Sequence, residues 1–225
     1  GNRISKKDAT LLSKRTEGWI VGLHMAVLSM RSSSNIHQYV SEFSAQNQYI
    51  TDYLLDEILL QQADDVKKFL LVTSVLDKFT APLCDYLLDI DHSQKNIDSL
   101  VRSGLFTIPL DTSRTWFRYH HLFSELLRIR LENSSTISAV DIHHKASVWF
   151  SNKEMLEESI EHAFLTEDYD LVIRRIEKLL PLVMTQGKFR TYLIWLERIP
   201  RDLLHKRPLL DIVKIFMLHE MGKKK

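Results

Sequence analysis

The sequence predicts a mainly α-helical protein: a helical bundle and a winged helix with one small β-hairpin, followed by tetratricopeptide-like antiparallel helix pairs. Apolar residues recur with the helical period of about 3.6 residues over most of the 225-residue chain. Only 6 Gly and 5 Pro interrupt this pattern, which leaves few signals for hairpins. The period shortens to two residues between positions 105 and 119, where a pair of strands is expected.

Residues 7–30 are expected to form two short helices. Asp8 lies near the start of the first helix, where a carboxylate is favourable. The second helix has an apolar face made of Trp19, Leu23, Ala26 and Val27. The polar run 31–35 then predicts a loop.

The middle of the chain has the pattern of a winged helix. Apolar faces predict four helices, at 54–59, 66–73, 81–88 and 93–102. Pro82 suits the first turn of the third helix, and Gly104 suits the C-terminal cap of the fourth. Two strands are expected at 105–108 and 115–119, around the turn 111–114, and a further helix follows.

Beyond about residue 140 the pattern is again helical, with short helices joined by short loops. Pro200 is expected to end one helix and Pro208 to begin another. Helices of this kind, each with one apolar face, predict stacked helix pairs. The aromatic residues here, such as Trp149 and Trp195, are expected to lie between the helices, with a ligand groove as the alternative.

Composition limits the possible functions. A single cysteine, Cys84, allows no disulfide within the chain and fits a reducing cytoplasm. No apolar run approaches the ~18–20 residues of a membrane span, so no membrane partner is expected. The net charge is +1, and residues 51–132 carry 9 Lys and Arg against 13 Asp and Glu. An acidic winged helix does not favour direct DNA contact, which usually needs several basic residues facing phosphates.

Catalytic motifs are missing from the sequence. It contains no Gly-x-x-x-x-Gly-Lys-Ser/Thr phosphate loop and no Gly-x-Ser-x-Gly elbow, so the chain is not expected to be an enzyme. The pairs His120/His121 and His143/His144 are adjacent in sequence, and adjacent residues on a helix diverge by about 100°. No metal site is therefore expected.

The segment Trp116–Phe123 contains the clearest candidate for a functional residue. It is predicted to run from a strand directly into a helix, with His120 at the junction. The start of a helix carries free N–H groups and the positive end of its dipole, so a histidine there could help to hold a phosphate. The alternative is a histidine that only caps or packs against the helix.

Several segments in order resemble the large ATP-binding regulators of the LuxR family, of the maltose-activator type. They are Thr16–Leu23, Tyr53–Ile58, Phe69–Leu76, Ala81–Cys84, Phe117–Phe123, Glu161–Ala163 and Trp195–Glu197. The resemblance implies three regions: 1–50 as the C-terminal helical part of a nucleotide-binding region, 51–135 as a winged helix, and 136–225 as the start of helical sensor repeats. It also suggests that the chain is the central piece of a longer protein.

The resemblance further implies a switch that rests with ADP and is activated by an inducer and ATP. The expected partners are the protein's own ATPase domain, an inducer bound to the helical repeats, and promoter DNA bound only through a C-terminal domain outside this chain. In the wider superfamily, a Met-His-Asp motif of the winged helix contacts the ADP phosphate, and His120 matches its histidine. His24 matches a position beside the nucleotide base, where the superfamily has Pro.

Two other classes of function remain open from the sequence. The chain could be a winged-helix protein that binds DNA itself, or a free-standing helical adaptor that binds other proteins. In the adaptor, His120 would be a packing residue, and no nucleotide would be involved.

Overall fold

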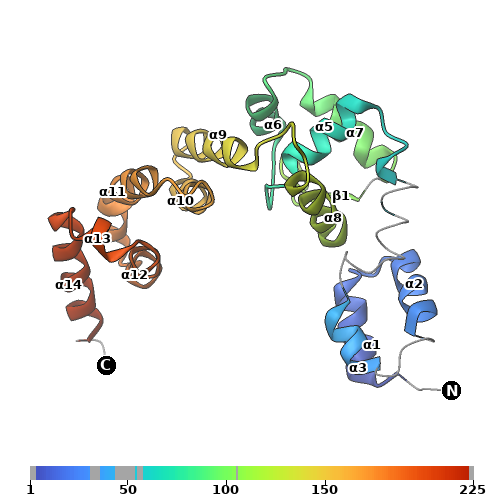
Figure 1. Cartoon of the computed structure of the whole chain (residues 1–225), viewed down its shortest axis with the longest axis horizontal. Coiled ribbons are helices and arrows are strands. Elements are labelled where there is room, and N and C mark those ends of the chain that lie inside the picture. The colour runs from blue at the N-terminus through green and yellow to red at the C-terminus, as the bar shows by residue number, and fades with distance from the viewer. Residues whose placement is uncertain (1–3, 31–35, 44–53, 55–57, 105, 223–225) are drawn as a thin grey trace. The chain divides into compact units, whose positions relative to one another are not determined.

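A computed structural model describes residues 4–30, 36–43, 54, 58–104 and 106–222. Within these residues the chain is mainly α-helical and contains one two-stranded antiparallel sheet, which confirms the predicted fold class (Figure 1). It divides into two compact units, residues 1–139 and 140–225.

The first unit begins with three helices, α1 (Lys6–Arg15), α2 (Ile20–Met30) and α3 (Ile36–Glu42). Ser5 caps α1 by accepting a hydrogen bond from the backbone N–H of Asp8 at 3.0 Å. The Asp8 carboxylate also lies 2.7 Å from His37 on α3, and α1 packs against α3. The two helices expected within 7–30 are present, whereas α3 was not predicted. The expected loop 31–35 lies outside the described residues.

A winged helix follows, with its elements close to the predicted positions. Residues 55–57 of the first expected helix lie outside the described residues. The other elements are α5 (Asp64–Thr73), α6 (Ala81–Leu88), α7 (Ser93–Arg102), β1 (Thr107–Pro109), β2 (Phe117–Tyr119) and α8 (His121–Glu132). Helix α5 packs against α6 and α8, and α6 packs against α7.

Local sequence signals set the ends of these elements. Thr80 caps α6 through its hydroxyl, and Pro82 lies in the first turn as expected. Gly104 has a φ of +66° just after the last turn of α7, a conformation that glycine adopts without strain. The hairpin pairs Thr107 with Tyr119 and Pro109 with Phe117, so both strands are shorter than predicted.

The core of the first unit forms where the hairpin and α8 meet α5. Phe69, Phe79, Phe117 and Phe123 are almost completely buried, each with at most 1% of its surface exposed. Inside this core, the Thr73 hydroxyl lies 2.7 Å from the Phe69 carbonyl and 2.6 Å from the Tyr119 hydroxyl. A carbonyl can only accept, so Thr73 donates to Phe69 and Tyr119 donates to Thr73.

The second unit consists of helices alone within its described residues. They are α9 (Ala139–Asn152), α10 (Leu156–Phe164), α11 (Tyr169–Gln186), α12 (Phe189–Arg198), the short α13 (Arg201–Leu204) and α14 (Pro208–Gly222). Helix α10 packs against α11, α11 against α12, and α12 against α14. Pro200 and Pro208 bound helices as expected, and Trp195 is buried in the shared core. The closer likeness to tetratricopeptide repeats stays a prediction.

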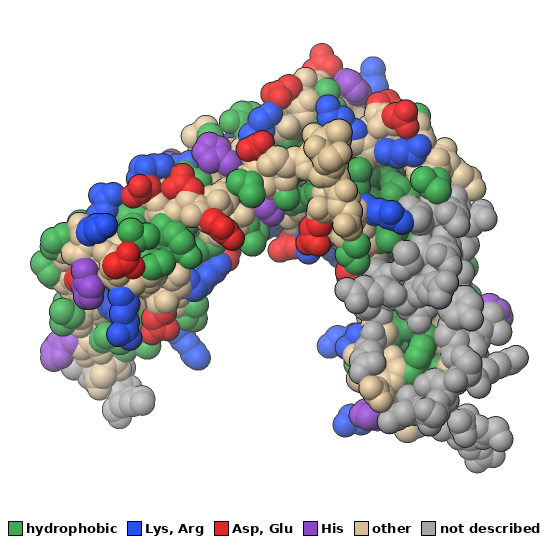
Figure 2. All heavy atoms as spheres, in the orientation of Figure 1, with side chains coloured by type: hydrophobic (Ala, Val, Ile, Leu, Met, Phe, Trp, Pro, Cys, Tyr) green, Lys and Arg blue, Asp and Glu red, His purple; other side chains and the backbone are tan. Residues whose placement is uncertain are grey.

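Two surface properties bear on function. Over the first unit, the face drawn in Figure 2 carries Lys and Arg side chains interspersed with Asp and Glu. Among the residues described there, charges of both signs are therefore mixed on that face. Among the described residues, no helix combines the length and the apolar character that crossing a bilayer requires.

Candidate functional site

The candidate site joins two segments that lie about a hundred residues apart in sequence. The first is the turn Thr16–Trp19, which links α1 to α2. Thr16 ends α1, Glu17 follows with a φ of +48°, and Gly18 has a φ of +76°. A positive φ is strained for a residue with a side chain, so Glu17 is held in this conformation by its surroundings.

The second segment is the junction of β2 and α8, with His120 between them. His120 is the N-cap of α8, and its Nδ1 accepts a hydrogen bond from the backbone N–H of Leu122 at 3.3 Å. Its Nε2 lies 2.9 Å from the Thr16 carbonyl oxygen. Because that carbonyl can only accept, Nε2 carries the proton, and the ring is the neutral Nε2–H tautomer.

His120 is tightly enclosed, with 5% of its surface exposed. Burial lowers the pKa of His120 below its usual value of 6.5, against the opposing effect of the hydrogen bond to Thr16. The Thr16 carbonyl also accepts the backbone N–H of Trp19 at 2.8 Å, so two donors share that oxygen. Both nitrogens of His120 therefore have partners within the chain.

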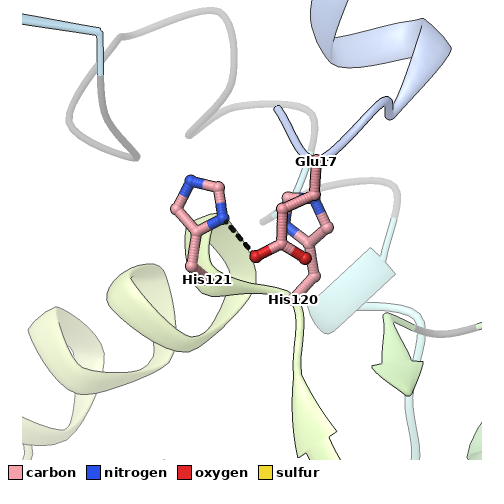
Figure 3. A group of neighbouring side chains, drawn as sticks. All are labelled: Glu17, His120 and His121. Atoms are coloured by element: carbon pink, nitrogen blue, oxygen red, sulfur yellow. Dashed lines mark hydrogen bonds and ion pairs between the residues drawn. The ribbon is translucent and has the colours of Figure 1, made fainter. Parts of the chain in front are cut away.

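Glu17 binds the other side of the same junction through its carboxylate. Arg118 on β2 donates to both carboxylate oxygens, with Nη1 3.2 Å from Oε1 and Nη2 3.0 Å from Oε2. His121 Nδ1 lies 3.0 Å from Oε1, as the dashed line in Figure 3 marks. Partial burial acts to raise the pKa of Glu17, but the hydrogen bonds from Arg118 and His121 outweigh it and lower the pKa. Glu17 is therefore ionised at neutral pH.

Aromatic packing completes the contact between the two segments. The Trp19 indole meets Phe106 edge-on, with ring centroids 5.0 Å apart, and lies 6.1 Å from the His120 ring. A side chain at Gly22 would overlap the Trp19 ring, so glycine at that position leaves room for the indole. Phe106 has a φ of +49°, and its carbonyl accepts the backbone N–H of His120 at 2.7 Å. We call the contacts of Thr16, Glu17 and Trp19 with Arg118, His120 and His121 the latch.

The side chains of His120 and His121 were expected to point in different directions, but they do not. The expectation treated both as helical, but His120 precedes α8 and has an extended backbone, with ψ at 135°. The rings of His120 and His121 therefore stack, with centroids 4.8 Å apart and planes inclined by 22°. The expectation that these two side chains diverge was therefore wrong.

The same geometry bears on metal binding. One possible ligand atom from each of Glu17, His120 and His121 lies within 4.8 Å of the others. A zinc ion would have to lie near the plane of both rings, about 2.0–2.1 Å from each nitrogen. Nearly parallel rings direct their in-plane lone pairs along separate lines, so a shared ion would require a different rotamer. As arranged, His121 binds the Glu17 carboxylate, and the two nitrogens of His120 bind Thr16 and Leu122.

A cleft of about 580 Å³ borders the latch. Arg118 and His121 contribute to its lining, together with Leu76, Asp77, Tyr119, Ser124, Glu125, Arg128, Ile129 and Glu132. The Arg118 and His121 side chains are 33% and 41% exposed. The two basic partners of Glu17 can therefore be reached by a small molecule.

The predicted site residues have different surroundings. His120 lies at the centre of the latch, whereas His24 lies on the exposed side of α2 and is not part of the His120 cluster within the described residues. The roles assigned to both remain predictions. Sequence reasoning missed Glu17 and Arg118. The pair Glu17–Gly18 does signal a turn, but nothing in the sequence indicates which distant residue the carboxylate meets.

Comparisons with known proteins identify the middle of the chain. Residues 55–138 match the family described as the MalT winged helix domain. The chain is 28% identical over 216 residues to the HTH-type transcriptional regulator MalT of Vibrio campbellii, which covers 95% of this chain and 24% of the relative. It is 30% identical over 171 residues to MalT of Yersinia enterocolitica, covering 75% of this chain and 19% of the relative.

A relative with a different described function matches the chain over a similar length. The serine/threonine-protein kinase PknK of Mycobacterium tuberculosis is 26% identical over 212 residues, which is 94% of this chain and 19% of the kinase. The chain therefore spans about a fifth to a quarter of the length of these relatives. The similarity extends well beyond the winged helix in both directions.

Proposed function

The chain belongs with the MalT-type regulators, and from this premise we propose that it is the central regulatory segment of a cytoplasmic, ATP-dependent, inducer-responsive transcriptional activator. Its role is to couple the nucleotide state of an ATPase region to signal sensing. The chain itself carries out no catalysis in this proposal. Promoter DNA is bound by a separate domain, and the inducer is bound by the helices of the second unit.

The latch is the observation that supports this coupling most strongly. It links the turn after α1 to the start of α8 in the winged helix. The turn after α1 lies in a segment that resembles the end of a nucleotide-binding region. Thr16 is fully buried at this contact, and His120 joins it to the start of α8 at 2.9 Å. A change of state on one side of the contact must therefore either move the other side or break the hydrogen bond.

His120 fits the role of a phosphate sensor in its chemistry. Its Nε2–H is a donor at the start of a helix, where the dipole favours an anion. In the present arrangement this donor is taken by the Thr16 carbonyl. Contact with an ADP phosphate would then require His120 to exchange one acceptor for the other, which would make the latch sensitive to nucleotide.

The relatives favour a regulatory role over direct DNA contact by this segment. A kinase and a transcriptional regulator share it over most of its length, so the shared part is not specific to either activity. Helix α7 is the helix that would have to enter the groove if this winged helix bound DNA. It has Lys95 and Arg102 but also Asp98, to which Gln94 donates at 2.9 Å. We expect the 225-residue chain to bind duplex DNA no more tightly than the non-specific range of about 10⁻⁴–10⁻⁶ M at physiological salt.

The test uses the complete polypeptide that carries this segment together with its ATPase region. His120→Ala should speed ADP dissociation and raise transcription in the absence of inducer, because the phosphate loses a donor. His143→Ala in the second unit is the matched control and should leave ADP dissociation unchanged. An ADP dissociation rate that is the same in the His120 variant and the wild type would contradict the proposal.

A further inference from the structure

Two basic side chains of α11 bind buried serines of α9 in the second unit. Arg175 donates from Nε to the Ser147 hydroxyl at 3.4 Å and from Nη1 to the Ser151 hydroxyl at 3.1 Å. One turn further along α11, Lys178 donates from Nζ to the Ser151 hydroxyl at 3.1 Å and to the Ser151 carbonyl at 3.0 Å. Two positive charges therefore meet at one serine hydroxyl.

These two cations lack an opposite charge within the part of the chain that the structure describes. Their hydrogen bonds there go to serines, and neither forms an ion pair with Asp or Glu. Glu177 lies between them in sequence, but it acts on α12, where burial and the Glu177 carboxylate raise the pKa of Tyr192. Burial, and then the positive charge of Arg174, lower the pKa of Arg175. A guanidinium that is partly withdrawn from water favours an anion beside it.

The serines form a fixed polar floor beneath the two cations. Ser147, Ser151 and Ser159 each have at most 1% of their surface exposed. Ser159 donates to the Ser147 carbonyl at 2.7 Å, so the Ser147 hydroxyl donates to the Ser159 hydroxyl 3.3 Å away. The Ser151 hydroxyl accepts from both cations, and its own proton has no acceptor among the described residues. One further donor is therefore available where the charges meet.

We propose that Arg175, Lys178 and Ser151 form a binding site for an oxyanion of the phosphate class. Arg175 is half-buried and Lys178 is exposed, so an ion can reach both from solvent. Nη2 of Arg175 donates to no described residue and has two N–H groups to offer. A phosphate group carries a charge of about −1.5 to −2 at neutral pH, which matches two cations better than one carboxylate does.

Helix capping explains only part of this arrangement. Lys178 donates to a carbonyl in the last turn of α9, which is a usual role for a lysine at the end of a helix. Arg175 donates to hydroxyls and to no carbonyl of that turn. A cap alone therefore does not require a second, desolvated cation at the same serine.

The site lies in the unit to which the proposed function assigns the inducer. The inference rests on the proposed function in one respect: if the inducer binds here, it carries a phosphate group. The binding of phosphate itself follows from the contacts between α9 and α11.

The experiment measures binding of inorganic phosphate to the 225-residue chain by calorimetry and amide NMR at constant ionic strength. Saturable binding is expected, with shifts concentrated at Ser147, Ser151, Arg175 and Lys178. Arg175→Gln should weaken binding about tenfold or more, because it removes a charged donor. Arg175→Lys should lie between this variant and the wild type, since it keeps the charge without the planar donor group.

Lys178→Gln keeps the test decisive if the Arg175 variants fold poorly, because Lys178 is exposed. It should weaken phosphate binding by about twofold to fivefold. The matched control is Lys188→Gln, which removes the same charge from an exposed pair with Glu157 in the same unit and should leave binding unchanged. No saturable binding, shifts confined to other residues, or equal losses in Lys178→Gln and Lys188→Gln would overturn the proposal.

The source of the phosphate group is tested by exchanging the probe. Glycerol phosphate bound at least as tightly as inorganic phosphate supports a phosphorylated small molecule, and inorganic phosphate bound alone supports the free ion. Acetate bound as tightly as phosphate would overturn the ligand class. Failure of the His120 test on ADP release would remove the proposed coupling and leave this site, whereas failure to bind phosphate would remove the site and leave the ADP test untouched.

Discussion

The contacts inside the two units of the molecule differ in the sequence separation of the residues that they join. In the second unit, successive helices contact one another, and the ion pair between Glu161 and Arg198 joins residues only 37 positions apart. In the first unit, the hydrogen bond between His120 and Thr16 joins residues 104 positions apart. The second unit is therefore built mainly from contacts between neighbouring helices, whereas the first unit adds to its apolar core polar contacts between segments far apart in sequence.

The same contrast appears in two glutamates that each bind an arginine. Glu161 lies 2.8 Å from Arg198, whose guanidinium covers the Phe164 ring at 3.7 Å, so this pair strengthens contacts between neighbouring helices. Glu17 binds Arg118 from a turn with positive φ. The pair in the second unit therefore joins neighbouring helices, whereas the pair in the first unit joins a turn to a strand 101 positions away.

The largest expected effect concerns the apolar core of the second unit. Ile176 on α11 is completely buried, and Ile176→Ala should lower the free energy of unfolding of this unit by about 2–5 kcal/mol, because it leaves a cavity. Urea denaturation followed by circular dichroism measures this loss. Amide NMR shifts of the latch residues should stay at their wild-type positions.

Ile212 on α14 provides the control, since 64% of its surface is exposed. Ile212→Ala should change the free energy of unfolding by no more than about 0.5 kcal/mol. A similar loss in both variants would mean that the apolar core described for this unit is not what stabilises it.

Most of the fold could be predicted because its signals are local. The ends of α6 and α7 match the predicted ranges, since Thr80 and Pro82 mark one helix start and Gly104 marks one helix end. The short helices α3 and α13 were missed because each is too short to establish an apolar period. The strands were predicted too long because their pairing depends on the partner strand.

A smaller effect is expected in the core of the first unit. Thr73→Val removes the hydroxyl that accepts the hydrogen bond from the buried Tyr119 hydroxyl, and it should lower the free energy of unfolding by about 1–3 kcal/mol. Tyr119→Phe removes the donor instead and leaves Thr73 bonded to Phe69, so it should cost less. In the double variant, much of the Thr73→Val loss should be recovered; purely additive losses would contradict the assigned direction of the bond.

The candidate site could be predicted only in part. A histidine at a strand-to-helix junction is visible in the sequence, so His120 was found. Its tautomer depends on the Thr16 carbonyl, and the role of Glu17 depends on Arg118, 101 positions away. Contacts over such separations are set by the packing of the whole unit, which no local pattern encodes.

The smallest expected effect is a dependence of stability on pH. Burial lowers the pKa of His120, so the folded state binds its proton less readily than the unfolded state, whose pKa is near 6.5. The stability that neutral His120 contributes is complete above pH 6.5 and is lost as the pH falls through the folded-state pKa. Urea titrations at about pH 7.5 and about pH 5.5 should therefore show a larger loss for the wild type than for His120→Gln.

His92→Gln is the control for this comparison, because that side chain is 48% exposed. It should retain the pH dependence of the wild type. If His120→Gln also retained it, the buried neutral imidazole would not be its source.

The latch is tested most directly by the protonation state of His120 in the 225-residue chain. Long-range nitrogen–proton NMR distinguishes the two ring nitrogens at neutral pH. The latch predicts a proton on Nε2, protected from exchange with water, and a bare Nδ1 that accepts from Leu122. A proton on Nδ1, or a ring that exchanges freely with water, would show that His120 does not join α8 to Thr16.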